Sequence, residues 1–243
     1  MGSAFGWGLL AASSLVLGAA VALRFRMGLR AIGLIMGFGA GVLLSAVAFD
    51  LIEEAVGKAS GHGATLVGFL AGCGVFFGGD LLIDRAGGGR SCGAHGRHED
   101  EPALAIVLGT VLDGIPESIV IGLTIYESGA VGAAYLAAVF ISNVPEAISS
   151  TTGLASSGWR PRRILGMWTL IAVLSGLASL VGYIAFRHAS PDTIAFMLAF
   201  AAGAILTMLA DTMMPEAYEH GGKLAGVVTT LGFALAFLID QLA

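Results

Sequence analysis

The sequence is short of charged residues and of cysteine. Charged residues make up 12% of the 243 residues, hydrophobic residues make up 56%, and the mean hydropathy is +0.88. An ordinary soluble domain has about 25% charged residues, so the composition excludes that class and leaves no room for a soluble catalytic domain. The chain is therefore predicted to be an integral membrane protein, and no nucleic-acid partner is expected.

Two further features are absent. Cys73 lies in a predicted span and Cys92 in a predicted cytoplasmic loop, which argues against a structural disulfide between the only two cysteines. A basic leader is also missing, because Arg24, Arg26 and Arg30 follow the first apolar segment instead of preceding it. This order argues against a cleaved signal peptide and favours a retained helix.

Eight apolar segments have the length of about 20 residues that a helix needs to cross a bilayer. They lie near residues 4–23, 31–56, 64–84, 103–126, 130–153, 163–187, 193–218 and 223–242. The predicted fold is an all-α polytopic membrane protein with eight transmembrane helices. Its 37 glycines suit close helix packing in lipid, and Gly37, Gly41, Gly72 and Gly74 are predicted packing residues.

Lys and Arg are distributed unevenly between the connections. The odd-numbered connections hold ten of the 12, whereas the even-numbered connections hold only Lys58 and Arg187. Cytoplasmic loops carry an excess of these residues. The odd-numbered connections are therefore predicted to be cytoplasmic, with both termini on the outer side.

The first three and the last three spans resemble each other. Residues 38–55 align without gaps on residues 200–217, and residues 66–69 resemble residues 230–233. Corresponding helices lie five spans apart, so the two repeats have opposite orientations, as in many secondary transporters. Chance similarity between helices rich in Ala, Gly and Leu is the alternative, and for the third span it is about equally good.

A 3+2+3 inverted-repeat arrangement follows from this alignment. The single membrane domain, residues 1–243, then consists of a first three-helix repeat (1–84), a cytoplasmic loop (85–102), a central helix pair (103–153) and a second, inverted repeat (163–243).

Both central spans carry acidic residues near mid-membrane. Asp113 and Glu117 share one face of the fourth span, and Ser142, Asn143 and Glu146 share one face of the fifth. The connection between these spans is short, so they form an antiparallel hairpin and the two faces can meet. Three buried carboxylates would cost roughly 9 kcal/mol, at about 3 each, if charged and uncompensated. Either they are protonated when the site is empty, or a divalent cation neutralises them.

A proline precedes the glutamate in both spans. Pro116 and Pro145 cannot donate to the carbonyls of Leu112 and Ile141, which leaves two acceptors for an ion or water and favours a kink that opens a cavity. The alternative is that the acids only hold the helices together. Such contacts usually use Ser, Thr, Asn or Gln, which cost less in lipid.

This pattern resembles that of the ZIP (Zrt/Irt-like) metal transporters, in which a His-Asn-x-Pro-Glu-Gly segment in span four faces a polar-polar-x-Pro-Glu segment in span five. The resemblance covers essentially the whole chain and implies a bacterial plasma-membrane protein that carries divalent metal ions toward the cytoplasm by alternating access. It also implies that spans one and six move with the central pair. The family's ligand positions fall on Asp113, Glu117, Ser142, Asn143 and Glu146.

The chain departs from the family pattern. Asp113 replaces the histidine, Gly114 replaces the asparagine, no span contains a histidine, and residues 164–186 contain no acid, so a centre with two metal ions is not expected. An all-oxygen ligand set favours manganese or ferrous iron without excluding zinc. The metal is a substrate, and no resident cofactor is expected. Metal binding should displace protons from Glu117 and Glu146, so uptake should weaken at acid pH. Whether the chain forms a homodimer in the lipid is left open.

Acidic residues also lie at the ends of the two repeated spans. Asp50 and Glu54 end the second span near the outer surface, and Asp211 and Glu216 end the seventh span near the cytoplasm. Acids at opposite mouths of a path would attract a cation and release it. These four residues are therefore predicted to line an access path.

The third connection, residues 85–101, holds Cys92, His95 and His98. Their spacing permits transient metal binding, although a linker with incidental histidines explains them about as well. The family resemblance favours a metal-receiving or sensing loop.

Two other functions are open. A metal-binding membrane sensor without transport is conceivable because the motif histidine is missing. An intramembrane hydrolase could use the carboxylates for acid and base chemistry. The sequence, however, lacks a His-Glu-x-x-His motif, a Ser-His pair within the spans and a complete Gly-x-Gly-Asp, of which residues 77–80 hold only part.

Overall fold

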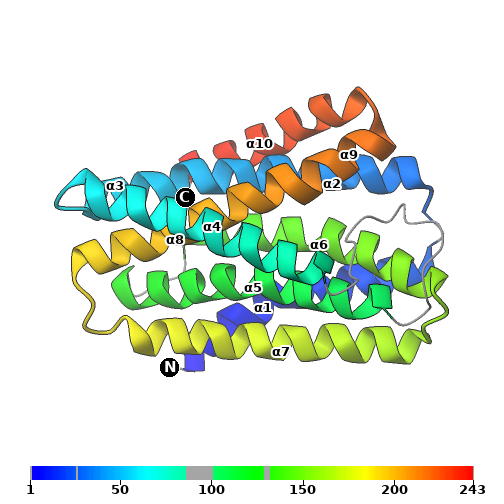
Figure 1. Cartoon of the computed structure of the whole chain (residues 1–243), viewed down its shortest axis with the longest axis horizontal. Helices are drawn as coiled ribbons and strands as arrows, with labels where there is room; N and C mark the ends of the chain where they lie inside the picture. Colours follow the sequence, from blue (N-terminus) through cyan, green and yellow to red (C-terminus); the bar gives the residue numbers. More distant parts are fainter. Residues whose placement is uncertain (1, 26, 86–100, 129–131, 243) are drawn as a thin grey trace.

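The computed structural model describes residues 2–25, 27–85, 101–128 and 132–242, which form helices joined by short connections (Figure 1). In chain order the elements are α1 (Gly2–Arg24), α2 (Leu29–Ala46), η1 (Val47–Glu53), α3 (Glu54–Lys58), α4 (His62–Arg85), α5 (Glu101–Ser128), α6 (Ala133–Ser156), α7 (Pro161–Ala185), α8 (Pro191–Met208), η2 (Leu209–Met213), α9 (Met214–Gly221) and α10 (Leu224–Leu242).

Two of the long helices contain a π-helical segment. The backbone stays in the right-handed helical region from α2 through η1 into α3, and again from α8 through η2 into α9. A π-helical segment changes the direction in which later side chains point, and such segments occur often at functional sites. In this chain Asp50 lies within η1, and Glu216 lies in the first turn of α9, three residues after the end of η2.

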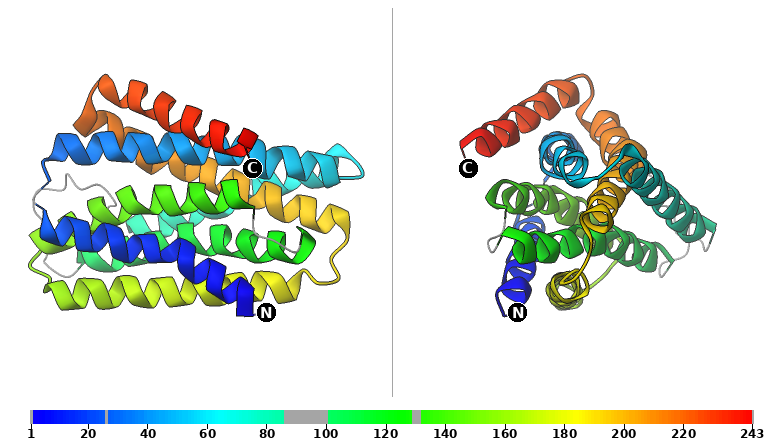
Figure 2. Two further views of the ribbon diagram at one scale, coloured as in Figure 1. Left: turned by 180° about the vertical axis from the view of Figure 1, so that it is seen from behind. Right: turned by 90° about the vertical axis from the view of Figure 1, so that its left-hand side faces the viewer.

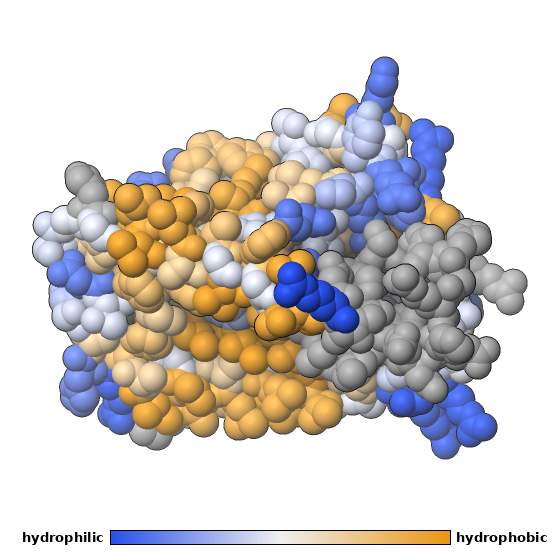
Figure 3. All heavy atoms as spheres, viewed as in Figure 1, coloured by the Kyte–Doolittle hydropathy of each residue, from blue (hydrophilic) through white to orange (hydrophobic). Residues whose placement is uncertain are grey.

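Within the described residues, six helices are long and apolar enough to cross a membrane: α1, α2 to α3, α4, α7, α8 to α9 and α10. The helices α5 and α6 have 28 and 24 residues, which is within the length range of these six helices. They differ in that they carry the acids, amide and prolines of the candidate site. Hydrophobic residues cover the middle of the face shown in Figure 3, and hydrophilic residues gather toward its two ends. The chain is therefore an all-helical integral membrane protein, as predicted.

The helices form two groups. The first contains α1, α5, α6 and α7, and the second contains α2 to α4 and α8 to α10 (Figure 2, right). Polar contacts tie the first group together, because Ser179 on α7 donates to the carbonyl of Ala4 on α1 at 2.9 Å. Trp168 on α7 likewise donates to Thr151 on α6 at 2.8 Å. The second group depends on close backbone contact, mainly of α4 with α8 and of α10 with α2.

Glycine permits these close contacts. A Cβ added at Gly41 would lie 1.9 Å from a backbone oxygen of α10, and one added at Gly72 would lie 1.9 Å from a backbone oxygen of α8. Gly37 has a looser contact, 3.2 Å from a side-chain oxygen. The prediction that Gly74 is a packing residue is wrong, because nothing lies within 4 Å of a Cβ added there. Gly74 lies on the outer side of α4, away from α8.

Successive helices run in opposite directions along the long axis (Figure 1). The connection from α3 to α4 and the connection from α7 to α8 lie at one end. The connections from α6 to α7 and from α9 to α10 lie at the other. Both termini lie in the half of the molecule that holds the α3 to α4 connection.

Candidate metal site

The central carboxylates lie on α5 and α6, and both helices continue through their internal prolines. Glu117 is 3% exposed. Its carboxylate interacts electrostatically with those of Glu146 and Asp113. The three acids that the sequence predicted on facing helices are therefore near enough to interact electrostatically.

Two small cavities adjoin these acids. The smaller, of about 10 Å³, is lined from α1, α5, α6 and α7 and includes Glu117, Asn143 and Glu146. The larger, of about 60 Å³, includes Asp113, Glu146 and Glu216. Glu146 lines both cavities and so connects them. Because a cavity of about 10–15 Å³ is needed to hold one water, the smaller has room for one ion or water and the larger for a few.

Asn143 and Ser142 differ although they are adjacent. The side-chain nitrogen of Asn143 donates to the carbonyl of Ala11 on α1, at 3.5 Å, and Asn143 lines the smaller cavity. This contact uses only the amide nitrogen, so the amide oxygen of Asn143 could serve as a ligand for an ion. The Ser142 hydroxyl instead donates to the carbonyl of Val139 on its own helix, at 3.0 Å. Of the two polar residues predicted on α6, the structure thus places Asn143 at a cavity.

The remaining donors are neutral oxygens. Within the described part of the chain, no three His, Cys, Asp or Glu side chains converge closely enough to hold a metal ion. Thr110 and Ser118 line the smaller cavity beside Glu117, and Thr110 lines the larger one as well. Every described Lys and Arg lies at a helix end or in a connection. The site therefore combines carboxylates with hydroxyl and amide oxygens, which suits a hard cation.

The acids predicted near the outer surface lie apart from the two cavities. Asp50 in η1 is half-buried and interacts electrostatically with Asp240 on α10 and with Glu54. Glu54 forms an ion pair with Lys58 at 3.4 Å. No pattern in the sequence predicted that the end of α10 lies near η1, so the interaction of Asp240 with Asp50 is known from the structure alone.

The acids predicted near the cytoplasm differ from each other. Glu216 lines the larger cavity and accepts a hydrogen bond from Ser149 of α6. Asp211 is exposed, and the next residue, Thr212, lines the cavity instead. His95 and His98, predicted as loop ligands, lie outside the described residues, as does Cys92.

The comparisons with known proteins give one similarity. No family model matches the chain. A protein of Arabidopsis thaliana named "Putative zinc transporter At3g08650" is 27% identical over 191 residues, which are 77% of this chain. The aligned part covers 30% of the Arabidopsis protein, so the chain spans less than a third of the length of that relative.

One buried hydroxyl was missed by the sequence reasoning. The Tyr135 side chain on α6 is 2% exposed, and its hydroxyl has no hydrogen-bond partner in the described structure. Tyr135 interacts electrostatically with both Glu117 and Asp50, so it is near one of the central acids and one of the acids predicted near the outer surface. The signal in the sequence was its position, since Tyr135 precedes Glu146 by three helical turns and shares its face.

Other lining residues could have been found from the same periodicity. Thr110 lies three residues before Asp113 on α5, and Ser149 lies three residues after Glu146 on α6. Residues at this spacing share a helix face. Each extends the polar face of its helix by one turn, toward the larger cavity.

Proposed function

We propose that the chain is a secondary transporter that carries divalent metal ions across the membrane toward the cytoplasm. The observation that carries the proposal is the placement of Glu117. Its carboxylate is buried within a membrane helix, beside two other acids and next to cavities of the size of an ion and its waters. Buried membrane acids are costly and usually mark an ion or proton pathway. The similarity to a protein named as a zinc transporter supports the same function.

The ion is held by Glu117 and Glu146, with the amide oxygen of Asn143 and with Asp113. Because the described carboxylates do not yet converge as a three-acid site, the ion has to draw them together when it binds. Binding of a cation offsets the mutual repulsion of the acids, which supplies the free energy for that movement. An all-oxygen set of this kind suits manganese and ferrous iron as well as zinc.

The larger cavity supports release toward the cytoplasm. It extends from Asp113 and Glu146 to Glu216 of α9, at the end of the molecule that the excess of Lys and Arg assigns to the cytoplasm. In the opposite direction, buried Tyr135 interacts electrostatically with both Glu117 and Asp50. We propose that its side chain closes the path toward the outside in this conformation, and that alternating access requires a second conformation in which Tyr135 moves aside.

An inverted repeat supplies that second conformation. The π segments η1 and η2 begin at Val47 and Leu209, which are paired by the sequence alignment of spans two and seven. The packing is also similar in the two repeats, since α4 packs against α8 and its counterpart α10 packs against α2. Two halves with the same internal packing and opposite orientations can exchange conformations, which is how many secondary transporters alternate.

The glycine contacts refine the pairing of spans three and eight. Gly72 approaches the backbone of Phe200, and Gly232 approaches that of Phe38. Phe38 and Phe200 occupy equivalent positions in the alignment of the two repeats. Gly72 and Gly232 are therefore equivalent positions as well. The sequence comparison had paired Gly68 with Gly232, one helical turn away.

The two groups of helices are the moving parts. The first group, α1 with α5, α6 and α7, carries the central acids. Hydrogen bonds join α1, α6 and α7, and α5 packs against α7. The second group carries Asp50, Glu54 and Glu216 along the path. A shift of the first group past the second would move the ion from the outer acids to the inner one, with both groups rigid.

The test is uptake of radiolabelled zinc and manganese into proteoliposomes. Glu117→Gln and Glu146→Gln keep side-chain size but remove the charge, so uptake should fall to the background of protein-free vesicles. Glu219→Gln, which neutralises an exposed acid of α9, is the matched control and should retain wild-type uptake.

The rival functions give different results in the same assay. A sensor would bind metal with a dependence on Glu117 but show no flux, and a hydrolase would show neither binding nor flux. Wild-type uptake by both Gln variants would refute the proposed site.

A further inference from the structure

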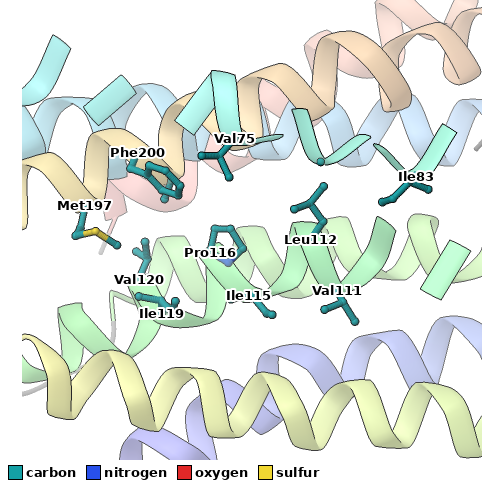
Figure 4. Close-up of a pocket in the computed structure, with 12 residues that line it drawn as sticks. Val75, Ile83, Val111, Leu112, Ile115, Pro116, Ile119, Val120, Met197 and Phe200 are labelled. Atoms are coloured by element: carbon teal, nitrogen blue, oxygen red, sulfur yellow. The ribbon is translucent and has the colours of Figure 1, made fainter. Parts of the chain in front are cut away.

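An apolar groove of about 470 Å³ lies between α5 on one side and α4 and α8 on the other (Figure 4). Leu112 and Pro116 form its wall on α5, Val75 and Gly79 form its wall on α4, and Phe200 forms its wall on α8. All the described residues that line it are apolar, glycine or proline. A ligand of this groove is therefore recognised by its apolar surface and shape.

The groove opens toward the lipid. Its rims include Val75 and Ile115, which are 55% and 41% exposed, and its walls belong to helices that lie within the membrane region. The medium at its mouth is therefore hydrocarbon. Apolar cavities of this kind stay dry and take up apolar molecules, and the volume is within the usual range of ligand pockets, about 300–1,000 Å³.

The groove is long, and a basic residue follows one end of it. From Val111 to Ile119, α5 advances about 12 Å at 1.5 Å per residue. Ile83 lines the groove near the end of α4, and the exposed Arg85 comes two residues later. An elongated apolar space beside a helix that ends in a cation matches a phospholipid, which has a hydrocarbon chain next to a negative phosphate.

We propose that this groove binds one acyl chain of an anionic phospholipid, with the lipid phosphate at Arg85. The acyl chain fills the space beside Pro116, on the side of α5 opposite the cavity that Glu117 lines. In this region α5 packs more extensively against α7 than against α4 or α8, so the lipid supplies contacts that the protein does not. Under the transport function proposed above, the lipid lies between the two groups of helices that move.

The experiment uses photo-crosslinking in proteoliposomes without metal, so its result does not depend on transport. The probe is a phosphatidylglycerol with a diazirine in one acyl chain, and the crosslinked residues are identified by mass spectrometry. Labelling of Leu112 and Ile115 should exceed labelling of Leu170 and Leu174, which are exposed on α7.

Two variants fill the groove and one matched variant does not. Gly79→Leu adds a side chain that points at Leu112, since a Cβ there lies 3.0 Å from a terminal carbon of Leu112. Gly74→Leu adds the same side chain to the same helix in open space. Val75→Phe is a second filling variant at an exposed position, in case Gly79→Leu does not fold.

Groove labelling should fall to the level of the α7 reference residues in Gly79→Leu and Val75→Phe, and stay at the wild-type level in Gly74→Leu. Arg85→Gln should lower it about fivefold, the change expected from one basic residue near an anionic membrane surface. Equal labelling of the groove and the α7 face would overturn the proposal, as would wild-type labelling in the filling variants or in Arg85→Gln. Disulfide-linked dimers of Val75→Cys without lipid labelling would instead assign the groove to a second copy of the chain.

Discussion

Two adjacent polar residues on α6, Asn143 and Ser142, are expected to differ in their effect on metal binding. Asn143 lines a cavity with its nitrogen held by Ala11, whereas the Ser142 hydroxyl bonds to the carbonyl of Val139. We expect Asn143→Ala to weaken metal binding by about tenfold or more, since the effect of a lost metal contact is commonly 10–100-fold. Ser142→Ala should change it by less than twofold. Isothermal titration of the purified protein with manganese measures both values.

Comparing Asn143→Ala with Ser142→Ala also controls for an effect on folding. Both variants remove one polar group from the same helix, so equal thermal stability shows that a difference in affinity comes from the site. A large loss of affinity in Ser142→Ala would show that its hydroxyl turns toward the ion when metal binds. That result would contradict the assignment of Ser142 to the helix backbone.

The unpaired hydroxyl of Tyr135 has a cost that function can explain. A buried polar group without a partner costs about 1–3 kcal/mol, so Tyr135→Phe should raise the melting temperature of the protein in detergent. If the hydroxyl contacts the ion between Asp50 and Glu117, uptake should fall about two- to tenfold, the effect of one hydrogen-bond-sized interaction. Faster or unchanged uptake in the more stable variant would show that Tyr135 only fills space.

At the scale of helices, backbone contact decides which glycines matter. Gly41→Ala would place a Cβ 1.9 Å from a backbone oxygen of α10, which forces the helices apart. We expect it to lower the free energy of unfolding by about 3 kcal/mol or more, the upper range for overpacking. Gly74→Ala makes no such contact and should be neutral or stabilising by up to about 1 kcal/mol, the helix preference of alanine over glycine. Denaturation in detergent micelles followed by circular dichroism compares the two variants.

The same contrast shows what the sequence can and cannot predict. Apolar length predicts the membrane helices well, because hydrocarbon thickness sets their length and lipid requires every backbone group to be bonded within the helix. Spacing within a helix predicts the common face of Asp113 and Glu117 for the same geometric reason. Contacts between helices are harder, since the composition of α4 does not show which side faces α8. Gly72 lies on the side of α4 that faces α8 and Gly74 does not, and nothing in the sequence distinguishes them.

Local irregularities set a second limit to prediction. A π segment adds a residue to a turn, so the direction of every later side chain shifts from the regular pattern. Within η2, Thr212 lines the larger cavity and Asp211 is exposed. No residue type in η2 predicts that a π-helical turn forms there. Asp211 was predicted from its charge and from its place near the end of the repeated span. Its role in the access path stays a prediction.

At the scale of the whole molecule, the proposed carrier cycle depends on which side of the central acids is open. The larger cavity joins the central acids to Glu216, and Thr212 lines the same space. Tyr135 interacts electrostatically with Glu117 and with the half-buried Asp50, which is predicted to lie near the outer surface. A carrier that alternates must expose these two regions in turn, never both together, because simultaneous exposure would make a channel.

Thr212→Cys tests this arrangement directly. In a background with Cys73 and Cys92 replaced by serine, a membrane-impermeant maleimide should label Thr212→Cys from the cytoplasmic side of oriented vesicles when metal is absent. Metal that shifts the protein to its outward-open conformation should slow that labelling severalfold. Glu219→Cys, an exposed position on α9, should be labelled from the same side at the same rate with or without metal. Labelling of Thr212→Cys from the outer side alone would reverse the proposed orientation, and equal labelling from both sides would replace the carrier with a channel.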